Sequence, residues 1–211
     1  MLKNISIFII LFAIYSILGW IMEMIAVYPK NNKFENRGFL LGPWCPIYGT
    51  GTILLITLLE KYKQDVFLLI IMSIIICSIL EYFTSYILEK IFKARWWDYS
   101  NKKFNICGRV CLTNAIAFGL LGFVVVKVIT PFFMKIINTF SSTVIYLIAA
   151  IIFIIMTIDF IYSCKGMIEF KGVDLKVRKD NTAEIAEKVK KELMRKSFIY
   201  KIIVKIRNKE R

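Results

Sequence analysis

Four apolar stretches, each long enough to cross a lipid bilayer as an α-helix, constrain this chain more than any other feature. They run over residues 5–27, 66–87, 110–129 and 143–164. About 20 helical residues cover a hydrocarbon core of about 30 Å. With 58% hydrophobic residues, the chain is also too apolar for a soluble domain of 211 residues. We therefore expect an all-α integral membrane protein, a polytopic bundle of transmembrane helices.

A fifth apolar stretch, residues 46–59, is too short to cross the bilayer as a regular helix. Pro46 suits the first turn of a helix, whereas Gly49 and Gly51 weaken that turn. Irregular backbone at membrane depth is tolerated only where it is buried in protein or lines a water-filled cavity. We therefore expect about five spans in all, with an irregular segment that dips into the protein before the second one.

The Lys and Arg residues of the connections predict the direction of the spans, because cytoplasmic loops are enriched in both. The first connection contains Lys30, Lys33 and Arg37, and the third contains six such residues, against two in the second and one in the fourth. We expect the amino terminus outside and the tail in the cytoplasm, although Lys3 favours the reverse. The first stretch is too long for the core of a signal peptide, so we expect a retained helix.

The composition changes after residue 165, which divides the chain into a transmembrane domain (residues 1–165) and a basic tail (residues 166–211). From residue 165 onward there are 15 Lys and Arg residues against 7 Asp and Glu residues. Asn181 and Glu184 resemble a capping pair, and apolar residues after them mark one helical face. We expect a cytoplasmic amphipathic helix on the anionic membrane surface. The alternative is a solvated helix that packs on a partner protein.

Charge and residue content argue against several classes of function. The net charge of +14 comes from Lys and Arg in the loops and tail, without a nucleic-acid-reading motif. We therefore expect membrane lipids as partners and no nucleic acid. The chain has no His, the commonest metal ligand and general base, and the spacing of its five Cys residues matches zinc motifs poorly. We expect no metal and no cofactor.

Charged residues inside the spans point to a site, because each costs about 2.5 to 3.5 kcal/mol at mid-membrane. Glu23, Glu81 and Asp159 lie late in three spans, at similar depth, and Ser73, Cys77, Glu81 and Ser85 form a polar stripe along one helix. Together with the loop charges they suggest a polar chamber at the cytoplasmic side. Its residues are Glu23, Arg37, Glu81, Arg95, Asp98, Arg109 and Asp159. Alternatively, each acid pairs with an Arg and only fixes helix packing.

Two unusual loops, residues 36–51 and 95–109, interrupt the apolar pattern. Their glycines and prolines can expose backbone N–H groups to a ligand or make a sharp re-entry, and their tryptophans and tyrosines fit an interfacial belt. Neither loop contains a P-loop or a dinucleotide-binding motif. The loop residues that we select are Asn36, Gly38, Gly42, Pro43, Cys45, Pro46, Tyr48, Gly49, Trp97, Tyr99, Asn105 and Gly108.

A series of short motifs carries a family resemblance. They are Gly19-Trp20 followed by Glu23, then NRGFL (36–40), GPWCPIYGTG (42–51), LEY (80–82), WWDYS (96–100) and FNICGRVCL (104–112). In this order they resemble a bacterial family catalogued as putative ABC-transporter permeases, type IV, over about residues 12–165. The resemblance implies a small permease-like subunit in the cytoplasmic membrane, energised by a separate ATP-binding subunit. The E-A-A…G loop by which ordinary importers dock on an ATPase is missing, which leaves this coupling open.

The residues leave other functions open. A proton-coupled carrier would use Glu81. A membrane-embedded enzyme acting on a lipid-linked substrate would use Asp98, Glu23 or Glu81 as acid or base, and arginines to hold phosphate. A non-catalytic accessory protein would use every polar residue structurally. We favour the transport subunit, which is not itself an enzyme; a homo-oligomer remains open.

Overall fold

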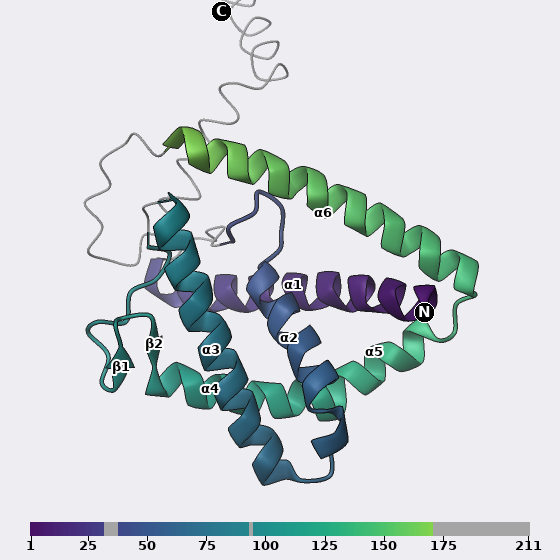
Figure 1. Cartoon of the computed structure of the whole chain (residues 1–211), viewed down its shortest axis with the longest axis horizontal. Coiled ribbons are helices and arrows are strands. Elements are labelled where there is room, and N and C mark those ends of the chain that lie inside the picture. Colours follow the sequence, from purple (N-terminus) through teal and green to yellow (C-terminus); the bar gives the residue numbers. More distant parts are fainter. Residues whose placement is uncertain (32–37, 93–94, 171–211) are drawn as a thin grey trace, which may run out of the picture.

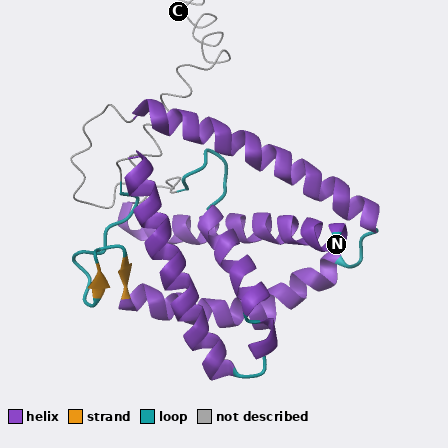
Figure 2. Ribbon diagram, viewed as in Figure 1, coloured by secondary structure: helices purple, strands orange, loops and turns teal. Residues whose placement is uncertain are grey.

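The computed structural model describes residues 1–31, 38–92 and 95–170, and it is mostly helical (Figures 1 and 2). This confirms the predicted all-α class. In chain order the elements are α1 (Leu2–Asn31), α2 (Pro46–Leu58), the 3₁₀ turn η1 (Glu60–Tyr62), α3 (Val66–Phe92), strands β1 (Asn105–Ile106) and β2 (Val110–Cys111), α4 (Leu112–Val124), the π-helical segment η2 (Val125–Ile129), α5 (Thr130–Ile137) and α6 (Ser142–Phe170).

Four helical segments are long and apolar enough to cross a membrane, as predicted. They cover Leu2–Ala26, Val66–Phe92, Leu112–Ile137 and Ser142–Lys165. The third combines α4, η2 and α5, and the π-helical widening lies just before Pro131, which lacks a backbone N–H and crowds the preceding turn. One predicted boundary is wrong: Val110 belongs to a short antiparallel hairpin, in which it pairs with Ile106, and the helix begins at Leu112.

Helix α2 is a half-span that begins beside the middle of α1. The Cys45 N–H donates to the Ser16 carbonyl at 2.8 Å, and Ser16 lies halfway along α1. At 1.5 Å per residue, the 13 residues of α2 extend about 20 Å, which is less than the hydrocarbon core. Residues 38–45, before α2, form bends without regular structure. The predicted short second element with an irregular approach is therefore confirmed.

The helices pack as neighbours in pairs, with α2 and α6 against α1 and with α3 against α4. One core cluster joins Leu11 and Tyr15 of α1 to Val125, Ile137 and Ile145. The Tyr15 and Thr130 hydroxyls share a buried hydrogen bond of 2.7 Å inside this apolar core. Much of the outer apolar surface is left exposed, on α6 above all, as a surface that faces lipid requires.

The second loop of interest lies at one end of the bundle, whereas the segment before α2 lies beside the middle of α1 and contacts Asp159 of α6. Figure 1 shows the carboxyl-terminal ends of α1, α3 and α6 on the same side as the β1–β2 hairpin, where α4 begins. The amino terminus lies on the opposite side. The predicted amphipathic helix of the tail lies outside the described residues.

Candidate functional site

Glu81 is the most buried acidic side chain of the described chain, with 4% of its surface exposed. It lies on the predicted polar stripe of α3, where Ser73 and Ser85 are buried as well. The Tyr99 hydroxyl, from the loop after α3, donates a hydrogen bond to the Glu81 carboxylate. The other carboxylate oxygen, Oε2, has no hydrogen-bond partner among the described residues. A buried acceptor without a partner is costly to maintain, so this oxygen is an exception among the buried polar groups of the described chain.

A second carboxylate and tyrosine pair lies beside the first. The Tyr48 hydroxyl, from the first turns of α2, donates to Glu23 Oε1 of α1 at 2.7 Å. Glu23 is close enough to Glu81 for their negative charges to interact, and it is less buried than Glu81. Four separate segments thus contribute to one set of groups, which we call the carboxylate–tyrosine cluster: Glu23, Tyr48, Glu81 and Tyr99.

Tyr99 acts in this cluster as a hydrogen-bond donor. Burial, and then the negative charges of Glu81 and Glu23, raise the pKa of the Tyr99 hydroxyl well above its usual range. The hydroxyl therefore keeps its proton at any physiological pH and orients one oxygen of Glu81. The other Glu81 oxygen, Oε2, is buried without a hydrogen-bond partner among the described residues.

Asp159 of α6 has a different role, because four donors surround it. The backbone N–H groups of Leu41 and Gly42 donate to its two oxygens at 3.0 and 2.8 Å, and the Trp44 indole N–H donates at 2.8 Å. The Ser163 hydroxyl adds a fourth bond at 3.1 Å. These bonds fasten α6 to the irregular segment that leads into α2, so Asp159 positions the start of α2.

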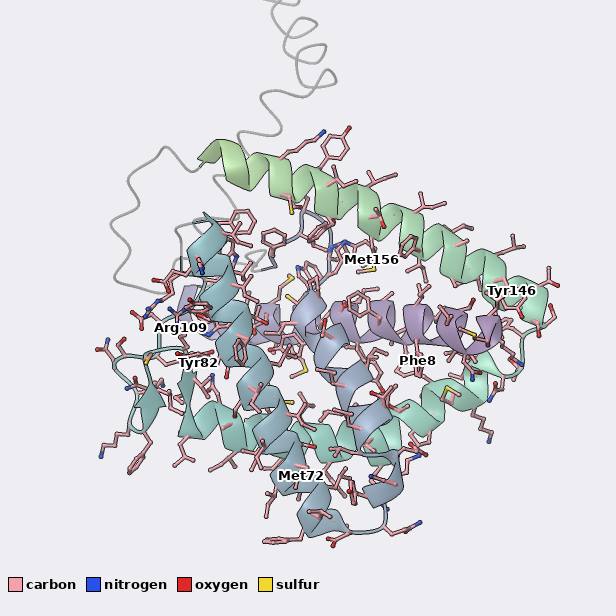
Figure 3. The ribbon with its side chains drawn as sticks, in the orientation of Figure 1. Phe8, Met72, Tyr82, Arg109, Tyr146 and Met156 are labelled. Atoms are coloured by element: carbon pink, nitrogen blue, oxygen red, sulfur yellow. The ribbon has the colours of Figure 1, made fainter. Side chains whose placement is uncertain are left out.

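The charged residues of the second loop form an ion-pair cluster at the end of α3. Glu89 accepts from Arg95 Nε at 3.1 Å and from Arg109 Nη2 at 2.8 Å. Arg109 also donates to Ser85 at 3.0 Å and lies over the Tyr82 and Tyr86 rings, as Figure 3 shows for Tyr82. The cluster anchors the loop to the helix that carries Glu81.

The turn around Gly108 is held by side chains of the same loop. Gly108 has a φ of +67°, and its N–H donates to Asn105 Oδ1 at 2.9 Å. The Trp97 indole donates to the Arg109 carbonyl at 2.9 Å, and the Tyr99 N–H donates to the Gly108 carbonyl at 2.8 Å. These bonds fix the backbone of Tyr99, and with it the hydroxyl that contacts Glu81.

Asp98 gives this loop a defined response to acid. Partial burial opposes its ionisation, but bonds from Ser100 and the charge of Arg95, 3.4 Å away, outweigh burial and hold the pKa of Asp98 below its usual value of about 3.9. A lowered folded-state pKa means that the ionised group stabilises the fold above about pH 3.9 and that this contribution is lost as the pH falls further.

We therefore predict that thermal stability of the wild type exceeds that of Asp98→Asn by a constant amount between pH 7 and about pH 5. The difference should shrink below about pH 4, where wild-type Asp98 takes up a proton. Unfolding midpoints of the two proteins across this range test the prediction. A difference that grows on acidification would contradict it.

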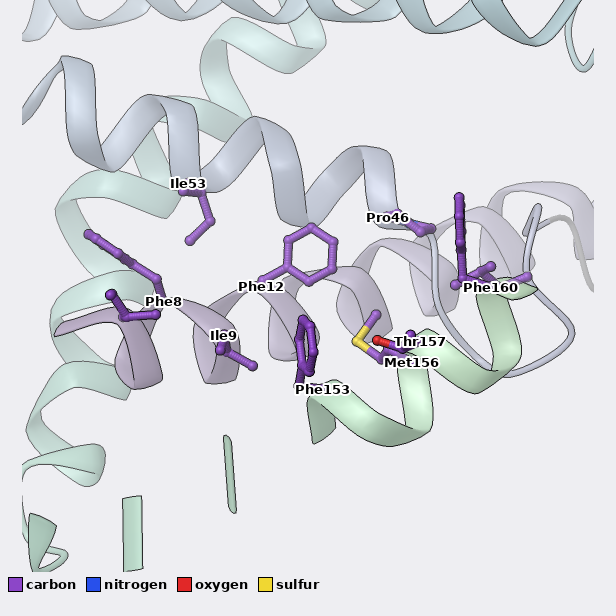
Figure 4. A pocket seen from close by; sticks show the side chains of 11 residues that line it. Phe8, Ile9, Phe12, Pro46, Ile53, Phe153, Met156, Thr157 and Phe160 are labelled. Atoms are coloured by element: carbon purple, nitrogen blue, oxygen red, sulfur yellow. The ribbon is translucent and has the colours of Figure 1, made fainter. Parts of the chain in front are cut away.

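An apolar cavity of about 530 Å³ lies between α1, α2 and α6 (Figure 4). Phe8 and Phe12 line one wall and Phe153, Met156 and Phe160 another. Its lining is almost entirely hydrocarbon, so it suits apolar chains and offers nothing to a charged ligand. It is separate in chemistry from the carboxylate–tyrosine cluster.

The structure distributes the predicted site residues over three groups. Glu23, Tyr48, Glu81 and Tyr99 form the carboxylate–tyrosine cluster. The second group holds together the loop that follows α3, and its members are Arg95, Trp97, Asp98, Asn105, Gly108 and Arg109. Asp159 holds the first loop through Gly42. In that loop Pro43 is exposed, whereas Gly38 and Cys45 are buried. Pro46 and Gly49 lie in the first turn of α2. Asn36 and Arg37 lie outside the described residues.

Four contributors were absent from the predicted set: Ser16, Trp44, Glu89 and Ser163. Ser16 and Ser163 could have been selected because each is a serine within an apolar span, where a hydroxyl needs a hydrogen-bond partner. Glu89 could have been selected because it lies near the end of a span, just before a loop with several Arg residues that can pair with it. Among the described residues, no three or more His, Cys, Asp or Glu side chains are placed to hold a metal ion.

Comparison with known proteins gives one match. The family model described as "Putative ABC-transporter type IV" matches residues 10–164, well over half of the chain. The matched range begins within α1, ends within α6, and includes all the elements and both loops between them. No curated protein and no solved structure matches the chain.

Proposed function

We propose that this chain, which belongs to the family of putative ABC transporters of type IV, is the membrane-spanning permease subunit of a transport complex. Four helices of membrane-spanning length and the family together support a membrane protein with a transport role. The proposal adds that a separate subunit binds ATP, that both loops and the tail face the cytoplasm, and that the protein acts in the bacterial cytoplasmic membrane.

The buried and vacant Glu81 Oε2 carries this proposal. A purely structural acid in a membrane would be fully paired, as Asp159 is. Glu81 instead keeps one oxygen without a partner among the described residues, beside the second carboxylate of Glu23. Two neighbouring acids beside a half-span resemble the sites that transporters build from discontinuous helices.

The cluster would work by selecting a positively charged or hydrogen-bond-donating part of a substrate. Glu81 Oε2 accepts from the substrate, while the Tyr99 hydroxyl holds the other oxygen in place. Glu23, which is nearer to water, adds negative charge and offers the first contact on the way in. Because Tyr99 and Arg109 belong to one loop, a movement of that loop would change the contacts of Glu81 and of Glu89 together.

The rival hypothesis, a lipid-processing enzyme with arginines that hold phosphate, has less support. Arg95 and Arg109 both bind Glu89, and Arg109 also binds Ser85 and lies over two tyrosine rings. An incoming phosphate would have to displace these contacts. The arrangement therefore suits arginines that hold a loop better than arginines that hold a substrate.

Purification of the tagged chain from its native membrane in mild detergent tests the partner. We expect a stoichiometric ATP-binding subunit, identified by mass spectrometry, and ATP hydrolysis in the eluate that a Walker-A lysine substitution in that subunit abolishes. A pure chain without ATPase, from membranes in which cross-linking before solubilisation also captures none, would contradict the permease proposal. Co-purified lipid that is chemically turned over would favour the enzyme instead.

A further inference from the structure

The tip of the β1–β2 hairpin presents apolar and basic side chains together, outside the membrane-spanning helices. Phe104 is 79% exposed and Ile106 is 60% exposed, and Lys102 and Lys103 beside them are exposed as well. Phe104 and Ile106 flank Asn105, which is less exposed than either of them. A large exposed ring and an exposed aliphatic chain in a loop need a partner surface.

The hairpin is held in a fixed shape, so the tip is a built feature of the loop. Phe104 and Cys107 both adopt positive φ angles, of 52° and 53°, which are uncommon for residues other than glycine. The Asn105 side chain fills the interior of the turn, where it donates to the Ser100 and Lys102 carbonyls at 3.3 and 2.8 Å. The Asn105 side chain thus points into the turn, whereas the side chains of Phe104 and Ile106 are exposed on its surface.

One backbone hydrogen bond fixes the depth of this tip relative to the bilayer. The N–H of Leu112 donates to the Phe104 carbonyl at 3.2 Å. Leu112 is the first residue of the membrane-spanning segment Leu112–Ile137, whose 26 residues extend about 39 Å, beyond a hydrocarbon core of about 30 Å. Phe104 is therefore held at the depth of the lipid headgroups, where aromatic and basic side chains are favoured.

We propose that the hairpin tip is a membrane-interface anchor that binds anionic lipid, with Phe104 and Ile106 among the headgroups and acyl-chain ends and with Lys102 and Lys103 on lipid phosphates. Lysines near an anionic surface and apolar side chains within it strengthen each other, because one supplies electrostatic attraction and the other buries apolar area. Arg95 and Arg109 do not take part, since they face Glu89.

The anchor bears on the carboxylate–tyrosine cluster through the rest of the loop. The backbone N–H of Tyr99, whose hydroxyl binds Glu81, donates to the Gly108 carbonyl, and Gly108 lies two residues after Ile106 in the turn. The lipid contact would thus hold the loop in the arrangement that presents the Tyr99 hydroxyl. This inference concerns the hairpin surface and holds whether or not the chain works with an ATPase.

Fluorescence from the full chain in lipid nanodiscs tests the anchor. Cys107 is exposed in the turn, so an environment-sensitive dye on this thiol reports on the tip, and labelled Cys107→Ser supplies the background from the other four cysteines. We expect quenching of the dye by phosphatidylglycerol brominated in its acyl chains, and little quenching by iodide in the water phase.

The charge dependence is tested by a matched pair of double variants. Lys102→Gln with Lys103→Gln should raise, by roughly thirtyfold, the ratio of brominated phosphatidylglycerol to phosphatidylcholine needed for half-maximal quenching, since each Lys contributes about 1 kcal/mol and about 1.4 kcal/mol is a factor of ten. Lys61→Gln with Lys63→Gln makes the same charge change near the opposite end of α3 and should leave the value unchanged. Phe104→Ser with Ile106→Ser should weaken the quenching of the dye by brominated phosphatidylglycerol.

Three results would overturn the anchor. Strong iodide quenching without bromolipid quenching would place the tip in water. Protection from both quenchers would mean that another protein covers the tip, and unchanged lipid dependence in the Lys102 and Lys103 variant would remove the role of charge.

Discussion

Gly49→Ala is expected to destabilise the protein by about 1 to 3 kcal/mol, the range for overpacking a closely packed interior. A β-carbon at this position would lie 2.5 Å from the Ser16 hydroxyl oxygen and 2.6 Å from the Phe12 carbonyl oxygen of α1. The carbonyl is part of the backbone of a helix and cannot turn aside. The half-span α2 would have to move away from α1, and Tyr48 would lose its alignment with Glu23.

Gly51→Ala is the matched control, at a glycine two residues further along α2. Its β-carbon would meet only the Leu80 side chain, at 3.3 Å, and that methyl group can adjust. Both substitutions gain about 1 kcal/mol of helix propensity. Unfolding midpoints in detergent should therefore fall for Gly49→Ala and stay level or rise for Gly51→Ala. Equal changes in the two variants would contradict the close packing of α2 on α1.

Glu81→Gln is expected to leave the fold intact and to abolish function. Glutamine has nearly the same shape, and its amide oxygen can still accept the Tyr99 hydrogen bond, but it removes the negative charge of the buried acid. Glu81→Leu differs because it leaves the Tyr99 hydroxyl without its acceptor, at a cost of about 1 to 3 kcal/mol if the hydroxyl stays buried.

Thermal unfolding separates the two substitutions. We expect a wild-type midpoint for Glu81→Gln and a lowered midpoint for Glu81→Leu. If Glu81→Gln lowers the midpoint as much as Glu81→Leu does, the negative charge of Glu81 serves the packing of the helices, and Glu81 does not belong to a binding site.

The helices could be predicted from sequence because a bilayer imposes one simple demand, about 20 apolar residues for each span. The short α2 was predictable for the same reason, since residues 46–59 fail that length. The burial of Glu81 followed from the polar stripe on α3, which had to turn away from lipid. The boundary at Val110 was wrong because a two-residue strand contributes too few residues to show a pattern.

The partners of the charged residues could be predicted only where they are close in sequence. Arg95 is three residues from Asp98, so the sequence alone places the two charges close together. Asp159 lies 118 residues from Leu41, and only the packing of α6 on α1 brings the two together. The sequence predicted three acids at similar depth. It contained no signal that Asp159 would bind backbone N–H groups of a loop, or that Glu23 and Glu81 would lie close to each other.

The pairing of Glu23 with Tyr48 depends on where α2 starts, which the sequence leaves open. The start is set by the Cys45 N–H, which binds the Ser16 carbonyl in the middle of α1. A start one turn later would move the Tyr48 hydroxyl by about 5 Å along α1, beyond reach of Glu23. Contacts of this kind require the three-dimensional arrangement.

ATP turnover by assemblies purified through three forms of the chain tests most directly whether the buried cluster serves an ATP-driven permease. The forms are the wild type, Glu81→Gln, and Glu60→Gln, which alters an exposed glutamate near the opposite end of α3. We predict equal amounts of ATP-binding subunit in all three, with turnover retained in the wild type and Glu60→Gln and lost in Glu81→Gln. Equal turnover in all three assemblies would show that Glu81 is not coupled to ATP hydrolysis, and would contradict the functional role assigned to the cluster.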